Sequence, residues 1–193
     1  MRILVLYSHP VETSFNASLH ETVVKTLKVS GHEVDDCDLY AEGFSPALSR
    51  QKRIDYHELD RNQANVADYV KRVEQAEALV LCYPVWNFGF PAMLKGFFDR
   101  VFLPGVSFRM ENGKVVPSLH NITKLAAVTH YGGSRTGAFL AGDPPRKIVK
   151  RVLRAQIKPM APLNYLALYD MSRATDTDSS SFLKKVETQM AHF

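Results

Sequence analysis

Three stretches of this 193-residue chain carry residue types that bind small ligands: Ser8–Asn16, Tyr83–Phe90 and Thr129–Gly133. The first is rich in hydroxyl and amide side chains and precedes a predicted helix. Free backbone N–H groups and the positive end of the helix dipole could bind an anion there. The glycines of a Walker loop or of a G-x-G-x-x-G motif are absent. Ordinary N-capping by Ser14 or Asn16 is the alternative, and taken alone it is the more common one.

The stretch Tyr83–Phe90 combines aromatic side chains with an amide and a glycine. Its rings and backbone N–H groups could line the face and the edge of a flat aromatic ligand. The alternative is that Trp86, Phe88 and Phe90 are core aromatics that cap a sheet. Taken alone, these residues do not decide between the two interpretations.

The stretch Thr129–Gly133 ends in two glycines, which would let backbone N–H groups approach a ligand closely. A plain turn is the alternative, because glycine pairs are common in turns. His130 and Tyr131 are the candidate catalytic residues of this stretch. A single histidine or tyrosine beside a site more often packs or hydrogen-bonds than takes part in the chemistry.

The aromatic stretch is positioned by a predicted strand at Ala78–Cys82, a continuous apolar run of the kind that is buried on both faces of a parallel sheet. Pro84 is predicted to end this strand because proline cannot donate to a ladder. An amphipathic helix follows over Pro91–Phe102, and Arg100 lies off its apolar stripe.

Periodicity and turn signals place the remaining elements. Further strands are predicted at Arg2–Tyr7, Glu33–Leu39, Lys124–Thr129 and Leu163–Leu168, and helices at Asn16–Val29, Arg61–Gln75, Arg146–Gln156 and Asp178–Ala191. The pair Asn112-Gly113 predicts a hairpin between Val106–Met110 and Lys114–Pro117. Ser49–Asp60 is interpreted as a polar linker and Thr175–Ser181 as a polar loop.

Composition excludes several classes of function. The net charge of +4 is spread along the chain without a dense basic cluster, which argues against nucleic-acid binding but suits phosphorylated cofactors. No apolar run is long enough for membrane insertion, and Met1–Tyr7 is interpreted as strand rather than as a targeting segment. Cys37 and Cys82 fit no metal or redox spacing, so we expect free buried thiols, a cytoplasmic location and no metal site.

A family resemblance enters with the segment Pro84–Phe102. It is similar to the signature of the NAD(P)H:quinone oxidoreductases, which are flavodoxin-like flavoproteins in which this loop lies against the isoalloxazine ring. His9 and Ser14-Phe15-Asn16 resemble the family's flavin phosphate loop. Thr129–Gly133 resembles the family's Thr-Thr-Gly-Gly stretch but is one residue longer. Where larger members carry a catalytic tyrosine and histidine, this chain has Ala138–Asp143, so those roles do not carry over and His130 and Tyr131 are the candidates to replace them.

The resemblance implies a flavin site and a set of residues for it. The cofactor-binding residues that it implies are His9, Ser14, Phe15, Asn16, Pro84, Val85, Trp86, Asn87, Phe88, Thr129, Gly132 and Gly133. The cofactor is FAD or FMN, and the sequence leaves this choice open. The implied reaction is two-electron hydride transfer from NAD(P)H through the flavin to a quinone-like acceptor, by a homodimer.

The alternation of strands and helices predicts an α/β fold in one domain, residues 1–193. We expect a doubly wound, five-stranded parallel sheet in the flavodoxin-like order 2-1-3-4-5, with helices on both faces. The three ligand-binding stretches would then meet at the carboxyl edge of the sheet. Two other functions stay open: a flavin-binding ancillary subunit of a membrane transporter, and a one-electron carrier. Flavodoxin carriers are generally acidic, whereas this chain is basic.

Overall fold

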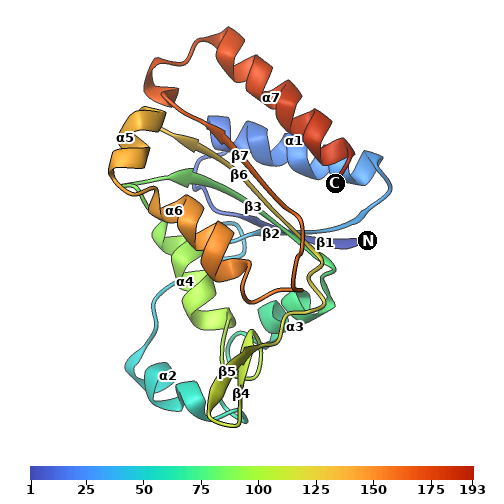
Figure 1. Cartoon of the computed structure of the whole chain (residues 1–193), viewed down its shortest axis with the longest axis vertical. Coiled ribbons are helices and arrows are strands. Elements are labelled where there is room, and N and C mark those ends of the chain that lie inside the picture. The colour runs from blue at the N-terminus through green and yellow to red at the C-terminus, as the bar shows by residue number, and fades with distance from the viewer.

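A parallel sheet forms the centre of the molecule in the computed structural model, which describes all residues from 1 to 193 (Figure 1). Its strands are β1 (Arg2–Tyr7), β2 (Glu33–Asp38), β3 (Ala78–Val85), β6 (Lys124–Tyr131) and β7 (Leu163–Leu168). They lie in the order β2-β1-β3-β6-β7, and every pair is parallel. Numbered along the chain among themselves, the five sheet strands follow the order 2-1-3-4-5, so the predicted topology is confirmed.

Helices cover both faces of this sheet (Figure 1). On one face lie α1 (Phe15–Val29) and α7 (Asp176–Ala191). On the other lie α3 (Ala67–Gln75), α4 (Ala92–Val101) and α6 (Pro144–Lys147), which continues into a π-helical segment over Ile148–Leu153. None of the helices is long and apolar enough to cross a lipid bilayer.

Successive side chains of each strand point to opposite faces of the sheet, so each face of the sheet has its own hydrophobic core. In β1, Ile3 and Val5 pack with the α1 and α7 side chains, whereas Leu4 and Leu6 pack with those of α3 and α4. Both cores are needed because a central parallel strand has no solvent-facing side. Cys37 and Cys82 are free and buried, one in each core, so their predicted burial is confirmed.

The prediction that Pro84 ends the central strand is wrong. β3 continues to Val85 and pairs with β6 as far as Tyr131. On its other side, β3 pairs with β1 only as far as Cys82. Beyond that point β3 has a partner on one side only, so a residue without an N–H group can remain in the strand.

Other predicted boundaries also need correction. The predicted linker Ser49–Asp60 contains α2 (Arg50–Ile54), capped by the Ser49 hydroxyl, and a 3-10 turn at Asp55–His57. Helix α3 begins at Ala67 rather than at Arg61, because residues 59–66 form turns.

Near the C-terminus two more boundaries change. The predicted polar loop at Thr175–Ser181 is the start of α7, because Thr175 and Asp178 form a reciprocal capping box. The predicted helix Arg146–Gln156 is divided between α6 and the π-helical segment. A short helix, α5 (Arg135–Leu140), was not predicted; the Ser134 side chain caps it.

The predicted hairpin is present as β4 (Phe108–Glu111) and β5 (Lys114–Pro117). Its loop residues have φ angles of 51° at Asn112 and 74° at Gly113. Two positive angles are what a two-residue hairpin loop requires, because its twist must match that of the strands. The hairpin lies with α2 at the end of the molecule furthest from α7 (Figure 1).

Arg100 was predicted to lie off the apolar stripe of α4, but it is only 5% exposed. Its guanidinium donates to the Ser45 carbonyl oxygen and lies over the Phe44 ring. The long side chain therefore packs beneath residues 44–48, which run across α4.

Candidate functional site

The three stretches predicted to bind a ligand meet at the carboxyl edge of the sheet. The His9 ring, from the loop after β1, lies 5.6 Å from the Trp86 ring, from the loop after β3. The Phe15 ring at the start of α1 lies 5.8 Å from the His130 ring of β6. Residues of the β3 and β6 stretches also share a cavity of about 190 Å³. The predicted convergence at one edge is therefore confirmed as geometry.

The loop after β1 presents donors without acceptors. The backbone N–H groups of Thr13, Phe15 and Asn16 make no hydrogen bond within the chain. The Ser14 hydroxyl caps α1 by accepting from the Ala17 N–H at 3.1 Å. Ser14 is therefore an N-cap of α1, as the alternative interpretation of this stretch expected. The cap still leaves the N–H groups of Phe15 and Asn16 in the first turn free to bind an anion.

Asn16 is completely buried, and neither atom of its amide group has a hydrogen-bond partner. The hydroxyl of buried Ser8 is likewise unpartnered. Buried polar atoms usually have partners, and leaving one without a partner costs roughly 1–3 kcal/mol. Such a cost is typical of a site whose partner is a ligand.

The loop after β3 is strained and exposed. Asn87 and Phe88 have φ angles of 48° and 55°, and the backbone closes around them through a pair of hydrogen bonds between Trp86 and Gly89. A bulky residue at positive φ is rare and costs about 1–3 kcal/mol. The side chains of Trp86 and Phe88 are 42% and 44% exposed, so these two are not core aromatics. Phe90 is partly buried and packs on Tyr83.

The glycine pair after β6 uses its carbonyl oxygens, but not its N–H groups, in hydrogen bonds within the chain. The Gly133 carbonyl accepts from the Asp170 N–H at 2.9 Å, and the Gly132 carbonyl accepts from Ser172 at 3.4 Å. The N–H groups of the two glycines make no hydrogen bond within the chain. Both glycines line the same small cavity as Val85, Asn87 and Phe88.

His130 and Tyr131 were predicted to lie in a loop, but both belong to strand β6. Burial, reinforced by the nearby His9, lowers the pKa of His130 to about 4, so its ring is neutral near pH 7. Tyr131 is 2% exposed, and its hydroxyl donates to Asp143 Oδ1 at 2.6 Å. The catalytic roles of these two residues stay predictions.

The placement of Thr129 does not support its predicted contact with a cofactor. Thr129 is fully buried, and its hydroxyl donates to the Tyr83 carbonyl oxygen at 2.6 Å. The side chain therefore ties β6 to β3. Pro84 is also buried, in β3, and Val85 is partly buried.

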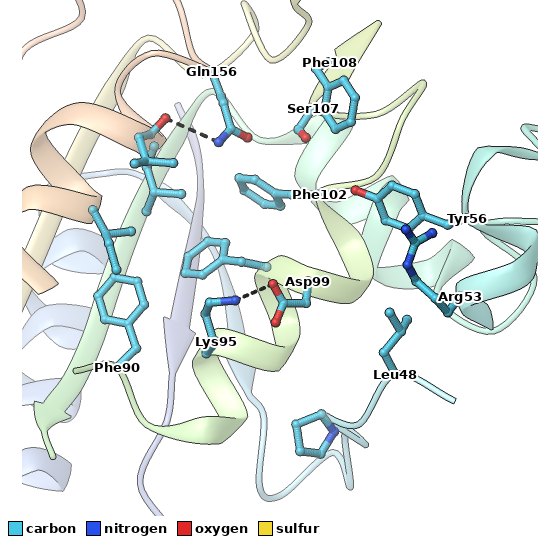
Figure 2. Close-up of a pocket in the computed structure, with 15 residues that line it drawn as sticks. Leu48, Arg53, Tyr56, Phe90, Lys95, Asp99, Phe102, Ser107, Phe108 and Gln156 are labelled. Carbon is cyan, nitrogen blue, oxygen red and sulfur yellow. Dashed lines mark hydrogen bonds and ion pairs between the residues drawn. The ribbon is translucent and has the colours of Figure 1, made fainter. Parts of the chain in front are cut away.

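A larger cavity, of about 550 Å³, is lined by Phe90 but by no other residue of the three stretches (Figure 2). It is bordered by α4, by Phe108 of the hairpin and by Arg53 and Tyr56 of the α2 region. None of its lining residues is a predicted cofactor-binding or catalytic residue. Nor does any cluster of histidine, cysteine and acidic side chains have the arrangement of a metal site.

The donors and surfaces at the carboxyl edge fit a flavin nucleotide. The free N–H groups and orphaned amide at the start of α1 suit a phosphate. The exposed Trp86 and Phe88 suit a flat ring, and the N–H groups of Asn87, Phe88, Gly132 and Gly133 have no acceptor in the chain. These are the polar edge donors that such a ring requires.

Two residues of this region carry no signal in the sequence. Ser8 follows a strand, which is a common position for serine. Only the structure shows that its hydroxyl is buried without a hydrogen-bond partner. Asp143 reads in the sequence as a residue before a helix. Its contact with Tyr131 depends on how α6 packs against the sheet.

Comparison with known proteins agrees with this geometry. The model of a family described by its flavodoxin-like fold matches residues 1–182. NAD(P)H dehydrogenase (quinone) 1 of Rattus norvegicus is 32% identical over 158 residues, which cover 73% of this chain and 57% of the rat protein. The chain spans about half the length of the curated relatives it matches.

Two solved structures extend the comparison over the whole chain. Smu.1420 from Streptococcus mutans UA159 has a TM-score of 0.83 at 27% identity, with full coverage of both chains. The NAD(P)H:quinone oxidoreductase from Methanothermobacter marburgensis also has a TM-score of 0.83, at 22% identity, over 99% of this chain and 98% of that one. At that identity, the second likeness concerns the fold alone.

Proposed function

Because this chain belongs to the flavodoxin-like fold family, we propose that it is a flavin-dependent NAD(P)H:quinone oxidoreductase. One observation carries the proposal. Free N–H donors, an orphaned buried amide and two exposed aromatic side chains come together from the ends of β1, β3 and β6. The names of relatives, among them the rat NAD(P)H dehydrogenase (quinone) 1, support the same activity.

The chain offers a holder for each part of FMN or FAD. The N–H groups of Phe15 and Asn16, with the Asn16 amide, would bind the phosphate, and His9 belongs to the same loop. Trp86, Asn87 and Phe88 would line the ring, and the N–H groups of Gly132 and Gly133 would donate to its polar edge. When bound, the flavin supplies the capacity to take up and release two electrons together.

The residues around the cofactor would orient the substrates rather than act as acids or nucleophiles. The exposed rings of Trp86 and Phe88 offer a stacking surface for a nicotinamide and then for a quinone. The overall balance is NAD(P)H, a quinone and one proton giving NAD(P)⁺ and a hydroquinone. Preorganised N–H donors at Gly132 and Gly133 would stabilise negative charge that develops on the ring.

A spectroscopic experiment tests this proposal. The purified protein is reconstituted with FMN and separately with FAD, and its visible spectrum is followed during anaerobic titration with NADPH and NADH. We expect bound flavin that bleaches in a single two-electron step and recovers its colour on addition of a quinone. A flavin that neither nucleotide reduces would contradict the enzyme and leave the carrier or transporter-subunit function. No flavin binding at all would contradict all three functions.

We further propose that the protein is a homodimer that works in the cytoplasm as one domain. The 550 Å³ cavity is lined by several aromatic side chains (Figure 2), and two of its apolar lining residues, Leu48 and Val152, are 37% and 51% exposed. Exposed apolar surface of this kind favours association with a second copy. Light scattering should give the mass of a dimer, and Val152→Asp should give a monomer; a monomeric wild-type protein would contradict the dimer.

The other two parts of this proposal have different support. The five sheet strands, drawn from residues 2–168, form one sheet, which supports a single domain over the 193 residues. Limited proteolysis should leave this domain intact. The two buried free thiols are consistent with a reducing compartment, and cell fractionation tests the cytoplasmic location.

A further inference from the structure

A partly buried network of hydrogen bonds lies beside the glycine pair of the candidate site. The Tyr131 hydroxyl donates to Asp143 Oδ1 at 2.6 Å and lies 2.8 Å from the Tyr165 hydroxyl. The Tyr165 hydroxyl lies 3.3 Å from that of Tyr83. On the other side of the carboxylate, Arg146 Nε donates to Asp143 Oδ2 at 2.8 Å.

The chemistry of the groups sets the direction of these bonds. A carboxylate paired with a guanidinium can only accept, so Tyr131 is the donor to Asp143. The Tyr131 oxygen is then free to accept from Tyr165, and the Tyr165 oxygen to accept from Tyr83. All three phenols thus point their protons toward Asp143, and Asp143 is the terminal acceptor of the network.

The phenols stay neutral. Burial raises the pKa of Tyr165 to about 12 and raises the pKa values of Tyr83 and Tyr131 well above the usual range for tyrosine. The network therefore contains one charge pair, between Asp143 and Arg146, and a row of neutral donors. Because the Tyr131 phenol is neutral and already donates to the Asp143 carboxylate, it is suited to fix the position of the backbone next to it.

The network ties the two strands that border the small cavity, β3 and β6, to β7 and to the start of α6. Tyr83, Tyr131 and Tyr165 belong to the neighbouring strands β3, β6 and β7, and Asp143 is the residue before α6. Tyr83 directly precedes Pro84 and the aromatic loop, and Tyr131 directly precedes the glycine pair. The hydrogen bonds thus act on both sides of the 190 Å³ cavity.

The backbone of Asp143 is itself strained, with a φ of 44°. Such a conformation is uncommon outside glycine and persists where surrounding contacts hold it. Here the contacts are the bonds from Tyr131 and Arg146 and a backbone bond from the Asp143 N–H to Ala138 at 2.8 Å.

We propose that Asp143 is a positioning residue of the flavin site, acting through the Tyr131 hydroxyl to hold the Gly132–Gly133 loop at its distance from the aromatic loop. This inference rests on the proposed function for its consequence, because the loop would present its N–H groups to the flavin. The placement of the loop itself can be measured without any flavin.

The experiment compares Asp143→Asn, Tyr131→Phe and the double variant with the wild-type protein. Asparagine tolerates positive φ, so Asp143→Asn removes the charge without adding backbone strain. Tyr40→Phe is the matched control, because it makes the same change at a tyrosine whose hydroxyl has no hydrogen bond to another side chain or to the backbone. Hydrogen exchange of the Asp170 amide in the flavin-free protein reports on the loop, since this amide donates to Gly133.

We expect the Asp170 amide to exchange about tenfold faster in each single variant, while the amides of α1 keep wild-type rates. FMN should bind about tenfold more weakly, and at saturating FMN its midpoint potential should become more negative. The double variant should resemble the single ones, because Tyr131→Phe removes the donor of the contact that Asp143→Asn weakens by replacing the carboxylate with a neutral amide oxygen. A purely global loss of stability would accelerate α1 as well and leave the potential of the saturated protein unchanged.

Wild-type exchange at Asp170 in both single variants would overturn the positioning role, whether or not flavin binds. If the wild-type protein fails to bind flavin, the proposed function is overturned while the exchange measurement still decides the role of Asp143. Equal effects of Tyr40→Phe and Tyr131→Phe would also overturn the inference, because they would show no dependence on the network.

Discussion

Gly96 of α4 lies directly against Pro46: a β-carbon at Gly96 would be 2.4 Å from the Pro46 β-carbon and 2.4 Å from its carbonyl oxygen. No side chain fits at that distance. The glycine therefore lets the segment that follows β2 cross α4 in contact with the helix backbone, one turn before Arg100 donates to Ser45. This contact packs the segment that leads to α2 onto the helix that follows the aromatic loop.

Gly96→Ala should therefore destabilise the protein by about 1–3 kcal/mol, because backbone atoms of Pro46 would have to move. Urea unfolding followed by circular dichroism measures the change. Gly133→Ala is the control, since a β-carbon there would meet nothing within 4 Å. An equal stability of the two variants would contradict the close approach.

Asn16→Leu should separate ligand binding from folding. The leucine fills a similar volume and removes two buried atoms that have no partner, so the flavin-free protein should keep its unfolding free energy or gain about 1–2 kcal/mol. FMN binding, measured by quenching of flavin fluorescence, should weaken by at least about tenfold.

Asn121→Leu is the matched control for that variant. The Asn121 amide donates to carbonyl oxygens of Val73 at 2.9 Å and Ala76 at 2.8 Å, at the end of α3. Its loss should cost about 1–3 kcal/mol of stability and leave FMN binding in place. If Asn16→Leu loses stability as Asn121→Leu does, the buried amide has a partner in the folded chain and the phosphate role is not supported.

Phe88→Gly and Phe88→Ala should differ in stability although both remove the exposed ring. Glycine adopts the φ of 55° without cost, whereas alanine keeps the strain, so the glycine variant should be more stable by about 1 kcal/mol. Both variants should raise the KM for a quinone, because the stacking surface is lost. A more stable alanine variant would mean that the loop at Phe88 is not strained.

His130 should make the protein sensitive to acid. Its pKa is about 4 in the folded protein, chiefly through burial, and about 6.5 when unfolded, so between these values the unfolded chain binds more protons. The stability contribution is complete above pH 6.5 and is lost as the pH falls toward 4, by up to about 1.4 kcal/mol per pH unit. His130→Gln should flatten this part of the pH profile of unfolding, whereas His57→Gln, at an exposed site, should leave it unchanged. A profile that keeps its slope in His130→Gln would assign the acid sensitivity to other groups.

Much of the fold could be predicted because its signals are local. The apolar run at Ala78–Cys82, the turn at Asn112-Gly113 and the period of Asn16–Val29 each follow from neighbouring residues. The predictions that were wrong concern residues whose structure depends on a partner far away in the sequence. Pro84 remains in β3 because β1 no longer pairs beside it, and Arg100 is buried because residues 44–48 cross α4.

The sequence by itself determined where the strands and the three candidate ligand-binding stretches lie, because alternation, apolar runs and loop composition are properties of adjacent residues. The strand order was expected from the handedness rule for parallel strands, and the flavin from the family resemblance. Only the tertiary structure decided what each side chain in those stretches does. The Thr129 hydroxyl donates to the Tyr83 carbonyl oxygen in β3, and the Tyr131 hydroxyl donates to the Asp143 carboxylate. The Asn16 side-chain amide has no hydrogen-bond partner. The physical reason is that each of these outcomes depends on sheet register and helix packing, which bring together groups far apart in the chain.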